Sequence, residues 1–185
     1  MGSWWSDHPD LEGVARRGRR ELEEEASEAE QDVELLRKRR RTLTDVCFEW
    51  MGRGDLVTLG VADQQFEGRV VTAVNDLVVI TTRTVEVAVN TASVTFARSD
   101  RAAVFEGTTG RRTVSSFRAE MGRYEVEGIS ARIVGSDGSF DLTGIIEAST
   151  DDHVLVRDQQ GTEWALARAA IECLIGETTR PVRPE

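Results

Sequence analysis

The feature that most constrains this chain is a change in the spacing of its apolar residues near residue 53. Before that point, apolar residues recur in alternating steps of four and three, the heptad spacing of a helix that buries one narrow seam. After it, they alternate with polar residues, which is typical of half-buried strands. We therefore predict a mainly β protein with a long N-terminal α-helix.

The heptad spacing runs from Leu22 to Trp50 without a proline. We expect a continuous helix over residues 21–51, within an N-terminal coiled-coil-like domain at 1–53. Its seam is either a self-association surface or a face that packs on the protein's own β domains, and the sequence leaves both open. The candidate self-association residues are Leu22, Ala26, Ala29, Val33, Leu36, Leu43, Cys47 and Trp50.

Charges along this helix are sorted by sign. Eight acidic residues lie within 21–34, and five consecutive basic residues follow at 37–41. In an antiparallel pair of helices centred between residues 34 and 35, Asp32 of one chain lies near Arg39 of the other. A parallel pair brings acidic residues of both chains together, which is unfavourable. The charge pattern therefore favours a homo-oligomer with antiparallel helices.

Beyond Gly54 the same strand pattern occurs twice, about 76 residues apart. The first copy contains Gly68 and a turn residue, Asp76. The second copy has Gly144 and Asp152 in the same places. Five short strands within some 45 residues suit a small closed barrel. We predict two tandem barrels at 54–98 and 126–175, joined by an Arg-rich linker with a short helix at 99–125 and followed by a disordered tail at 176–185.

This pattern resembles the Sm-like family within the wider group of small SH3-like β-barrels. The resemblance is carried by the N-terminal helix, by Gly-Asp-Leu-Val-Thr-Leu at 54–59, and by the spaced glycine, aspartate and apolar positions of both copies. It implies a ring-forming or RNA-associated barrel, with bases held by the turn between strands two and three and by an Arg-Gly pair before strand five. In the second copy, Arg168 is half of such a pair.

Residues 98–123 reverse the sign of the chain's charge. The whole chain has 23 basic and 33 acidic residues, a net charge of −10, whereas this segment has six arginines against three acids. Arginines beside aromatic residues are typical of nucleic-acid surfaces, but also of a helix that packs between acidic domains. We favour the packing interpretation. The candidate partner or nucleic-acid contacts are Arg98, Arg101, Arg111, Arg112, Arg118, Arg123 and Arg168.

Nothing in the sequence points to catalysis. The two histidines, His8 and His153, lie far apart, and there is no phosphate loop, nucleophile elbow or dinucleotide fingerprint. Cys47 and Cys173 fall on apolar positions and are interpreted as small buried hydrophobic residues. We predict no catalytic residue, cofactor or metal site. With no membrane-spanning run or secretion signal, we expect a cytoplasmic protein.

These observations favour a non-catalytic interaction or scaffold protein. It would self-associate through its N-terminal helix and present its barrels or linker to an unidentified protein partner. The alternative is an RNA-binding Sm-like protein that contacts RNA through Arg98–Arg123 and Arg168. RNA affinity would fall steeply with salt, which separates the two hypotheses.

Overall fold

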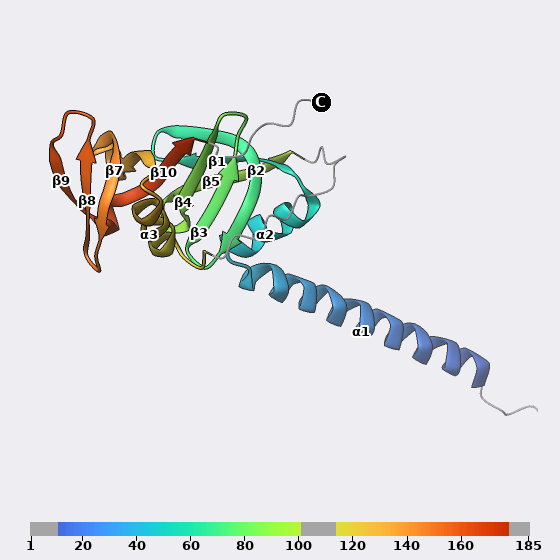
Figure 1. Cartoon of the computed structure of the whole chain (residues 1–185). Coiled ribbons are helices and arrows are strands. Elements are labelled where there is room, and N and C mark those ends of the chain that lie inside the picture. Colours follow the sequence, from blue (N-terminus) through green and yellow to red (C-terminus); the bar gives the residue numbers. More distant parts are fainter. Residues whose placement is uncertain (1–10, 101–113, 178–185) are drawn as a thin grey trace, which may run out of the picture. The chain divides into compact units, whose positions relative to one another are not determined.

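The computed structural model describes residues 11–100 and 114–177 of the chain (Figure 1). The chain divides into two compact units, Met1–Arg41 and Thr42–Glu185. The first contains helix α1 (Leu11–Arg40). The second contains helices α2 (Leu43–Arg53) and α3 (Phe117–Glu127) together with the described strands.

The prediction of one continuous helix over residues 21–51 is wrong, because α1 ends at Arg40 and α2 begins at Leu43. Between them, Thr42 has an extended backbone (φ −78°, ψ 165°) and its hydroxyl accepts a hydrogen bond from the Asp45 amide. The Asp45 carboxylate in turn accepts one from the Thr42 amide at 2.8 Å. This capping box starts a new helix by satisfying two amides that have no carbonyl partner in a first turn.

Helices α2 and α3 have the same construction. Each has 11 residues and follows a hydroxyl N-cap, Thr42 or Ser116, whose side chain accepts from the third amide of the helix. Each ends at a glycine in the left-handed region, Gly54 (φ 70°) or Gly128 (φ 61°), where other residues are strained. The break after Arg40 therefore precedes a new helix, α2, whose construction α3 repeats later in the chain.

Each of these helices is followed by five strands, with a short 3₁₀ turn before the fifth. The turns are η1 (Thr91–Ser93) in the first half and η3 (Arg168–Ala170) in the second, which also has η2 (Ser136–Gly138). The strands are β1 (Leu56–Val61), β2 (Gln64–Val74), β3 (Leu77–Thr81), β4 (Val85–Asn90), β5 (Val94–Asp100), β6 (Ser130–Gly135), β7 (Asp141–Ser149), β8 (His153–Asp158), β9 (Glu163–Ala167) and β10 (Ile171–Glu177).

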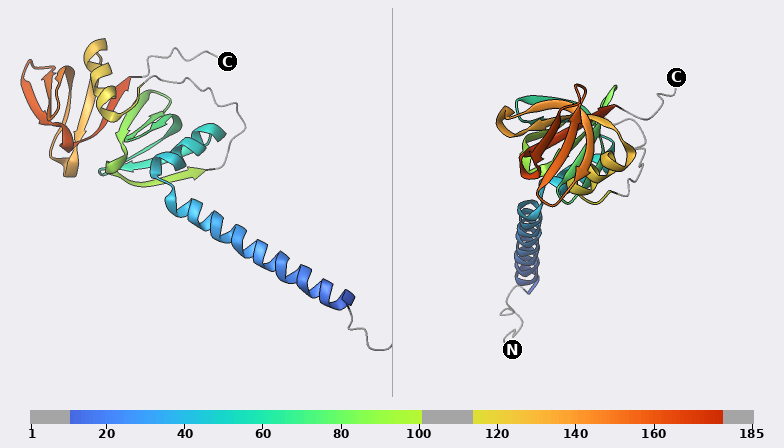
Figure 2. Two further views of the ribbon diagram at one scale, coloured as in Figure 1. Left: turned by 90° about the horizontal axis from the view of Figure 1, so that it is seen from below. Right: turned by 60° about the vertical axis from the view of Figure 1, so that its left-hand side comes forward.

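The prediction of two separate closed barrels is wrong. All ten strands form one open antiparallel sheet in the order β5-β1-β2-β3-β4-β10-β6-β7-β8-β9, and Figure 2 shows how strongly it curves. Instead of closing its own half, β4 pairs with β10, with Val89 opposite Cys173 and Val85 opposite Glu177. The two halves thus share one sheet because the fourth strand of the first half takes the fifth strand of the second as its neighbour.

Strand irregularities recur at matching positions in the two halves. The β2–β3 ladder shifts register between Val70 and Thr72, and the β7–β8 ladder shifts between Ile146 and Ala148. The shared glycines have a common steric cause. A Cβ atom on Gly68 or on Gly144 would lie 2.5 Å from a carbonyl oxygen of the next strand. Only glycine permits that approach, so the repeated glycine reflects strand packing.

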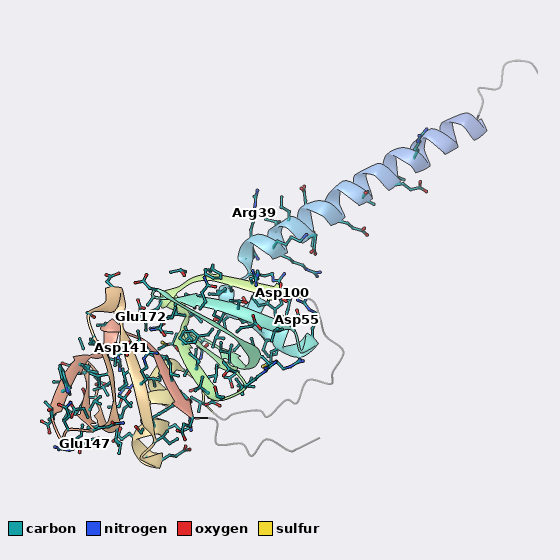
Figure 3. All side chains as sticks on the ribbon, turned by 90° about the horizontal axis from the view of Figure 1, so that it is seen from above. Arg39, Asp55, Asp100, Asp141, Glu147 and Glu172 are labelled. Carbon is teal, nitrogen blue, oxygen red and sulfur yellow. The ribbon has the colours of Figure 1, made fainter. Side chains whose placement is uncertain are left out.

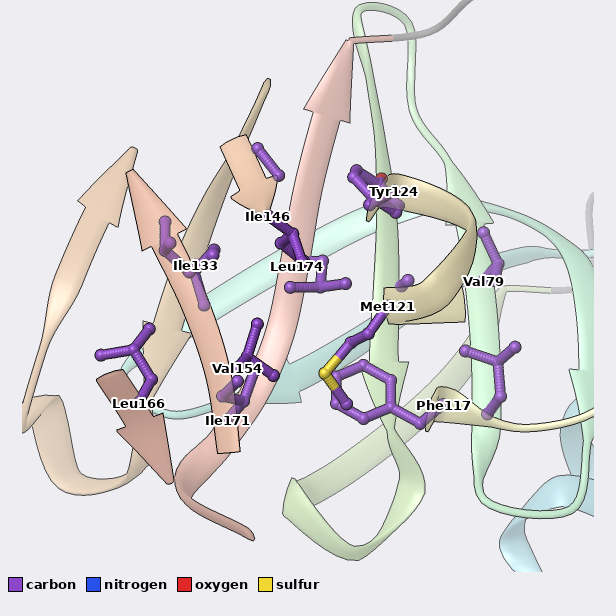
Figure 4. Close-up of a cluster of buried hydrophobic side chains, with 14 residues drawn as sticks. Val79, Phe117, Met121, Tyr124, Ile133, Ile146, Val154, Leu166, Ile171 and Leu174 are labelled. Atoms are coloured by element: carbon purple, nitrogen blue, oxygen red, sulfur yellow. The ribbon is translucent and has the colours of Figure 1, made fainter. Parts of the chain in front are cut away.

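Two buried apolar clusters fill the second unit, and both cross the β4–β10 junction. One joins α3 and the second half with Leu77, Val79 and Ala88 of the first half (Figure 4). The other fills the first half and includes Val134 and Cys173 of the second. The halves therefore share cores as well as a sheet. Of the predicted tail at 176–185, residues 178–185 lie outside the described residues, and β10 extends to Glu177.

Candidate interaction surfaces

Helix α1 exposes the apolar residues of the predicted seam. Leu22 is 66%, Val33 51% and Leu36 52% exposed, and Ala26 is exposed as well. The side chain of Ala29 lies outside the described residues. Polar side chains such as Arg39 project from the same helix (Figure 3). Because helices in proteins gain most of their stability from a covered apolar face, this seam is a candidate contact surface.

The remaining members of the predicted seam lie in α2 and are used within the chain. Cys47 is completely buried, and Leu43 and Trp50 pack against the same core cluster. The seam is therefore split at Thr42 into an exposed part on α1 and a buried part on α2. Only the α1 part stays a candidate self-association surface.

The two cysteines are free and buried. Burial raises the pKa of the Cys47 thiol to about 11 and that of Cys173 to about 12, because the apolar surroundings disfavour the thiolate. Both stay protonated at neutral pH. They therefore serve as packing residues and lack the character of a nucleophile.

Arg123 of α3 lies at the centre of a cluster of carboxylates. Its Nη2 atom donates to Oε1 of the completely buried Glu120 at 2.7 Å, and Nη1 donates to Glu127 at 2.6 Å. Nη2 also lies 3.4 Å from Oε1 of Glu86 on β4, and the guanidinium stands 4.7 Å from the Tyr124 ring centre. Burial by itself lowers the pKa of Arg123, but the hydrogen bond and charge of Glu120 outweigh it and raise the pKa. The cluster fastens α3 of the second half to β4 of the first.

The N-terminus of α3 is attached to the first half at the turn between β2 and β3. The Phe117 amide donates to Oδ1 of Asp76 at 2.9 Å. Nδ2 of Asn75 donates to the carbonyl of Ser115 at 2.8 Å. The sequence marked Asp76 only as a repeated turn residue, and its role as a cap was missed because the helix that it caps lies 41 residues away.

The other candidate arginines are spread over the second unit. Arg98 pairs with Asp100 at 3.3 Å, Arg118 pairs with Asp151, and Arg168 donates to the Thr150 carbonyl at 3.2 Å. Arg118 and Arg168 thus contact adjoining residues of the turn between β7 and β8, whereas the partners of Arg98 and Arg123 lie elsewhere. Three further candidates, Arg101, Arg111 and Arg112, lie outside the described residues.

The sheet ends in two edge strands. Within the described residues, β5 pairs only with β1, and β9 pairs only with β8. Both edges carry a large exposed ring, Phe96 on β5 and Trp164 on β9, each 42% exposed. Exposed edges with apolar side chains are favourable sites for pairing with another strand.

Neither a metal-binding cluster nor a membrane-spanning helix occurs in the described part of the chain. It contains no group of three or more His, Cys, Asp and Glu side chains that would bind a metal ion. His153 contacts Asp152 at 2.7 Å, but both side chains face solvent. None of the described helices is long and apolar enough to cross a membrane.

Comparison with known proteins adds no family. No protein-family model matches the chain, and no curated protein matches it significantly. The resemblance to Sm-like proteins therefore stays a prediction from the sequence. The function has to be argued from the surfaces themselves.

Proposed function

We propose that the protein is a non-catalytic interaction or scaffold protein that self-associates by pairing α1 with α1 of a second copy. The observation that carries this proposal is the exposed seam of Leu22, Val33 and Leu36 on a helix of 30 residues. Covering such side chains releases about 1.5–3 kcal/mol each when burial is complete. The same self-association would let one assembly present several copies of the second unit to a protein partner.

The charges of α1 support a second copy in antiparallel orientation as its partner. The acidic residues at 21–34 and the basic residues at 37–41 are complementary only when the two helices run in opposite directions. In the parallel orientation, acids face acids over most of the helix, which favours separation.

The end of α1 at Arg40 changes the favoured register. With the centre between residues 34 and 35, the two α1 helices overlap only over residues 29–40. With the centre at Gln31, they overlap over 22–40, and Leu36 of one chain meets Ala26 of the other. The second register covers the whole α1 seam, so we favour it.

The seam is tested by a double substitution with a matched control. Val33→Glu with Leu36→Glu places two charges in the seam, and we expect at least about a tenfold loss of dimer affinity, equivalent to ~1.4 kcal/mol. Leu35→Glu is the control, because Leu35 is 46% exposed on the same helix but lies off the seam. Sedimentation equilibrium of the full chain gives the affinities. A parent protein that is monomeric at micromolar concentration contradicts the proposal.

Asp32 distinguishes the two registers. With the centre at Gln31, Asp32 faces Asp32 of the second copy, so Asp32→Asn removes a like-charge contact and strengthens the dimer by about twofold. With the centre between 34 and 35, Asp32 faces Arg39 and the same substitution weakens the dimer.

Two other interpretations have their own signatures in the same samples. If the seam packs on the second unit, the parent is a monomer and the double substitution lowers its unfolding midpoint. If the protein is an RNA reader, it retains nucleic acid at low salt, which its ultraviolet absorbance ratio reveals. A cytoplasmic location belongs to the proposal as well, since a reducing compartment keeps the free cysteines Cys47 and Cys173 as thiols.

A further inference from the structure

Helices α2 and α3 each keep one large apolar side chain in solvent. Phe48 of α2 is 57% exposed, and Val126 of α3 is 86% exposed. The opposite faces of both helices are covered, since Cys47 lies in one core cluster and Met121 in the other (Figure 4). A single exposed apolar residue is common on protein surfaces, so the residues beside these two decide whether they form a contact.

Each exposed side chain lies one helical turn from a glycine, and the order is reversed between the two helices. On α2, Phe48 comes first and Gly52 follows, whereas on α3 Gly122 comes first and Val126 follows. A Cβ atom on either glycine would meet nothing within 4 Å. When the helices are aligned from their N-caps, Phe48 stands level with Gly122. By the same alignment, Val126 stands level with Gly52. Each helix therefore projects a side chain where the other has free space, as in knobs-into-holes packing.

The charges beside these residues are complementary as well. Glu49 follows Phe48 on α2, and its side chain is 49% exposed. Arg118 precedes Gly122 by four residues on α3, and its side chain is 56% exposed. In two parallel helices, a residue just before the contact line meets the residue five positions further along its partner, as g and e positions do in coiled coils. Arg118 therefore comes next to Glu49 when α3 packs parallel to α2.

Both helices begin beside the turn between β2 and β3. The Thr44 hydroxyl of α2 donates to the Asn75 carbonyl, and Nδ2 of Asn75 donates to the carbonyl of Ser115, just before α3. A two-fold axis that bisects two helices exchanges their directions. In a copy rotated about that axis, α3 lies parallel to α2 of the first chain, and α2 lies parallel to its α3.

We propose that two copies of the chain form a two-fold dimer in which α2 of each packs parallel to α3 of the other. Phe48 fills the space beside Gly122 of the second copy, and Val126 fills the space beside Gly52. Arg118 and Glu49 form an ion pair at the border of each contact. Because the dimer is symmetric, the same contact occurs twice. This surface is separate from the seam of α1 and does not depend on the proposed function.

The experiment uses the full chain with Val33→Glu and Leu36→Glu, so that pairing through α1 does not contribute. In this background, Glu49→Arg brings two bases together across the contact, and Arg118→Glu brings two acids together. Each variant alone is expected to dimerise about tenfold more weakly than the background protein, because the reversed ion pair occurs twice. Both side chains are exposed, so the fold is retained, as circular dichroism checks.

Mixing these two variants provides the decisive measurement. In the mixed dimer, one contact joins the new guanidinium to the new carboxylate, and the other contact has the original pair. Sedimentation velocity is therefore expected to show dimers recovered in the mixture only. Recovery requires α2 of one chain to meet α3 of the other. If α2 meets α2, Arg118→Glu changes nothing. That result, or a mixture without recovery, overturns the proposal.

Gly122→Ala separates the contact from the fold. The methyl group is expected to stabilise α3, because alanine is the better helix former, yet to weaken the dimer about threefold or more, because it occupies the space for Phe48. Phe48→Ser is expected to weaken the dimer about tenfold or more. The control is Ile145→Ser on β7, where the side chain is 44% exposed, and it leaves the affinity unchanged. A background protein that stays monomeric at hundreds of micromolar contradicts the proposal, whatever the outcome for α1.

Discussion

Helices α2 and α3 begin the two halves of the second unit in the same way, yet they are fastened differently. α3 crosses to the other half, where Arg123 reaches Glu86 and the Phe117 amide reaches Asp76. α2 bonds within its own half, where the Thr44 hydroxyl donates to the Asn75 carbonyl at 2.7 Å. On α2, Phe48 is 57% exposed. Helix α3 therefore links the two halves, whereas α2 is bonded within its own half.

The largest effect is expected at the Arg123 cluster, which links α3 to β4. Arg123→Met removes the guanidinium from the buried Glu120. We expect it to destabilise the protein by about 3–5 kcal/mol, the usual cost of removing one partner of a buried ion pair. Chemical denaturation measures the loss. Arg132→Met is the matched control, because its pair with Asp141 is 42% and 46% exposed and is worth at most about 1 kcal/mol.

A compensated variant sharpens this comparison. Arg123→Met together with Glu120→Leu removes both charges and is expected to recover most of the lost stability. If the double variant is as unstable as Arg123→Met alone, the lost stability comes from packing. The attraction between the charges of Arg123 and Glu120 then does not stabilise the contact.

The next effect tests whether the halves are equivalent in their strands. Gly68→Ala and Gly144→Ala each place a Cβ atom 2.5 Å from a backbone carbonyl oxygen, and each is expected to cost about 1–3 kcal/mol. Gly122→Ala in α3 is the control. Its Cβ atom meets nothing within 4 Å, so it is expected to stabilise the helix by about 0.5–1 kcal/mol. Thermal unfolding measures both losses. If only one of the two strand substitutions lowers the unfolding midpoint, the two halves are not equivalent in their strands.

The smallest expected effect concerns stability at acidic pH, which we expect to depend mainly on carboxylates of the second half. Hydrogen bonds from Arg132 and Arg157 lower the pKa values of Asp141 and Glu147. A carboxyl whose folded pKa is depressed contributes stability above its unfolded pKa of about 4, and this contribution is lost as the pH falls through the folded pKa.

The side chains of Asp141 and Glu147 are 46% and 37% exposed, so the pH effect is modest and is screened by salt. Denaturation at neutral and acidic pH is expected to show a smaller pH dependence in the Asp141→Asn, Glu147→Gln variant than in the parent protein. An equal pH dependence would show that Asp141 and Glu147 do not carry the acid sensitivity.

Much of the local structure could be predicted from the sequence, but its connections could not. The alternation at Val57, Leu59 and Val61 lies in β1, and all three residues are buried. The break at Thr42 was missed because Leu43 and Cys47 keep the heptad spacing beyond it. A capping box of threonine and aspartate was the available signal, since Thr42 and Asp45 stand three residues apart.

The sequence by itself determined the periods of helix and strand, the repetition of the strand pattern, and the glycines at Gly68 and Gly144. These depend on neighbouring residues and on side-chain size, which a sequence displays directly. Only the tertiary structure decided that β4 pairs with β10 and that Arg123 forms ion pairs with buried carboxylates. Strand pairing uses main-chain amides and carbonyls, which every residue except proline supplies, so the choice of neighbouring strand leaves no local signature in the sequence.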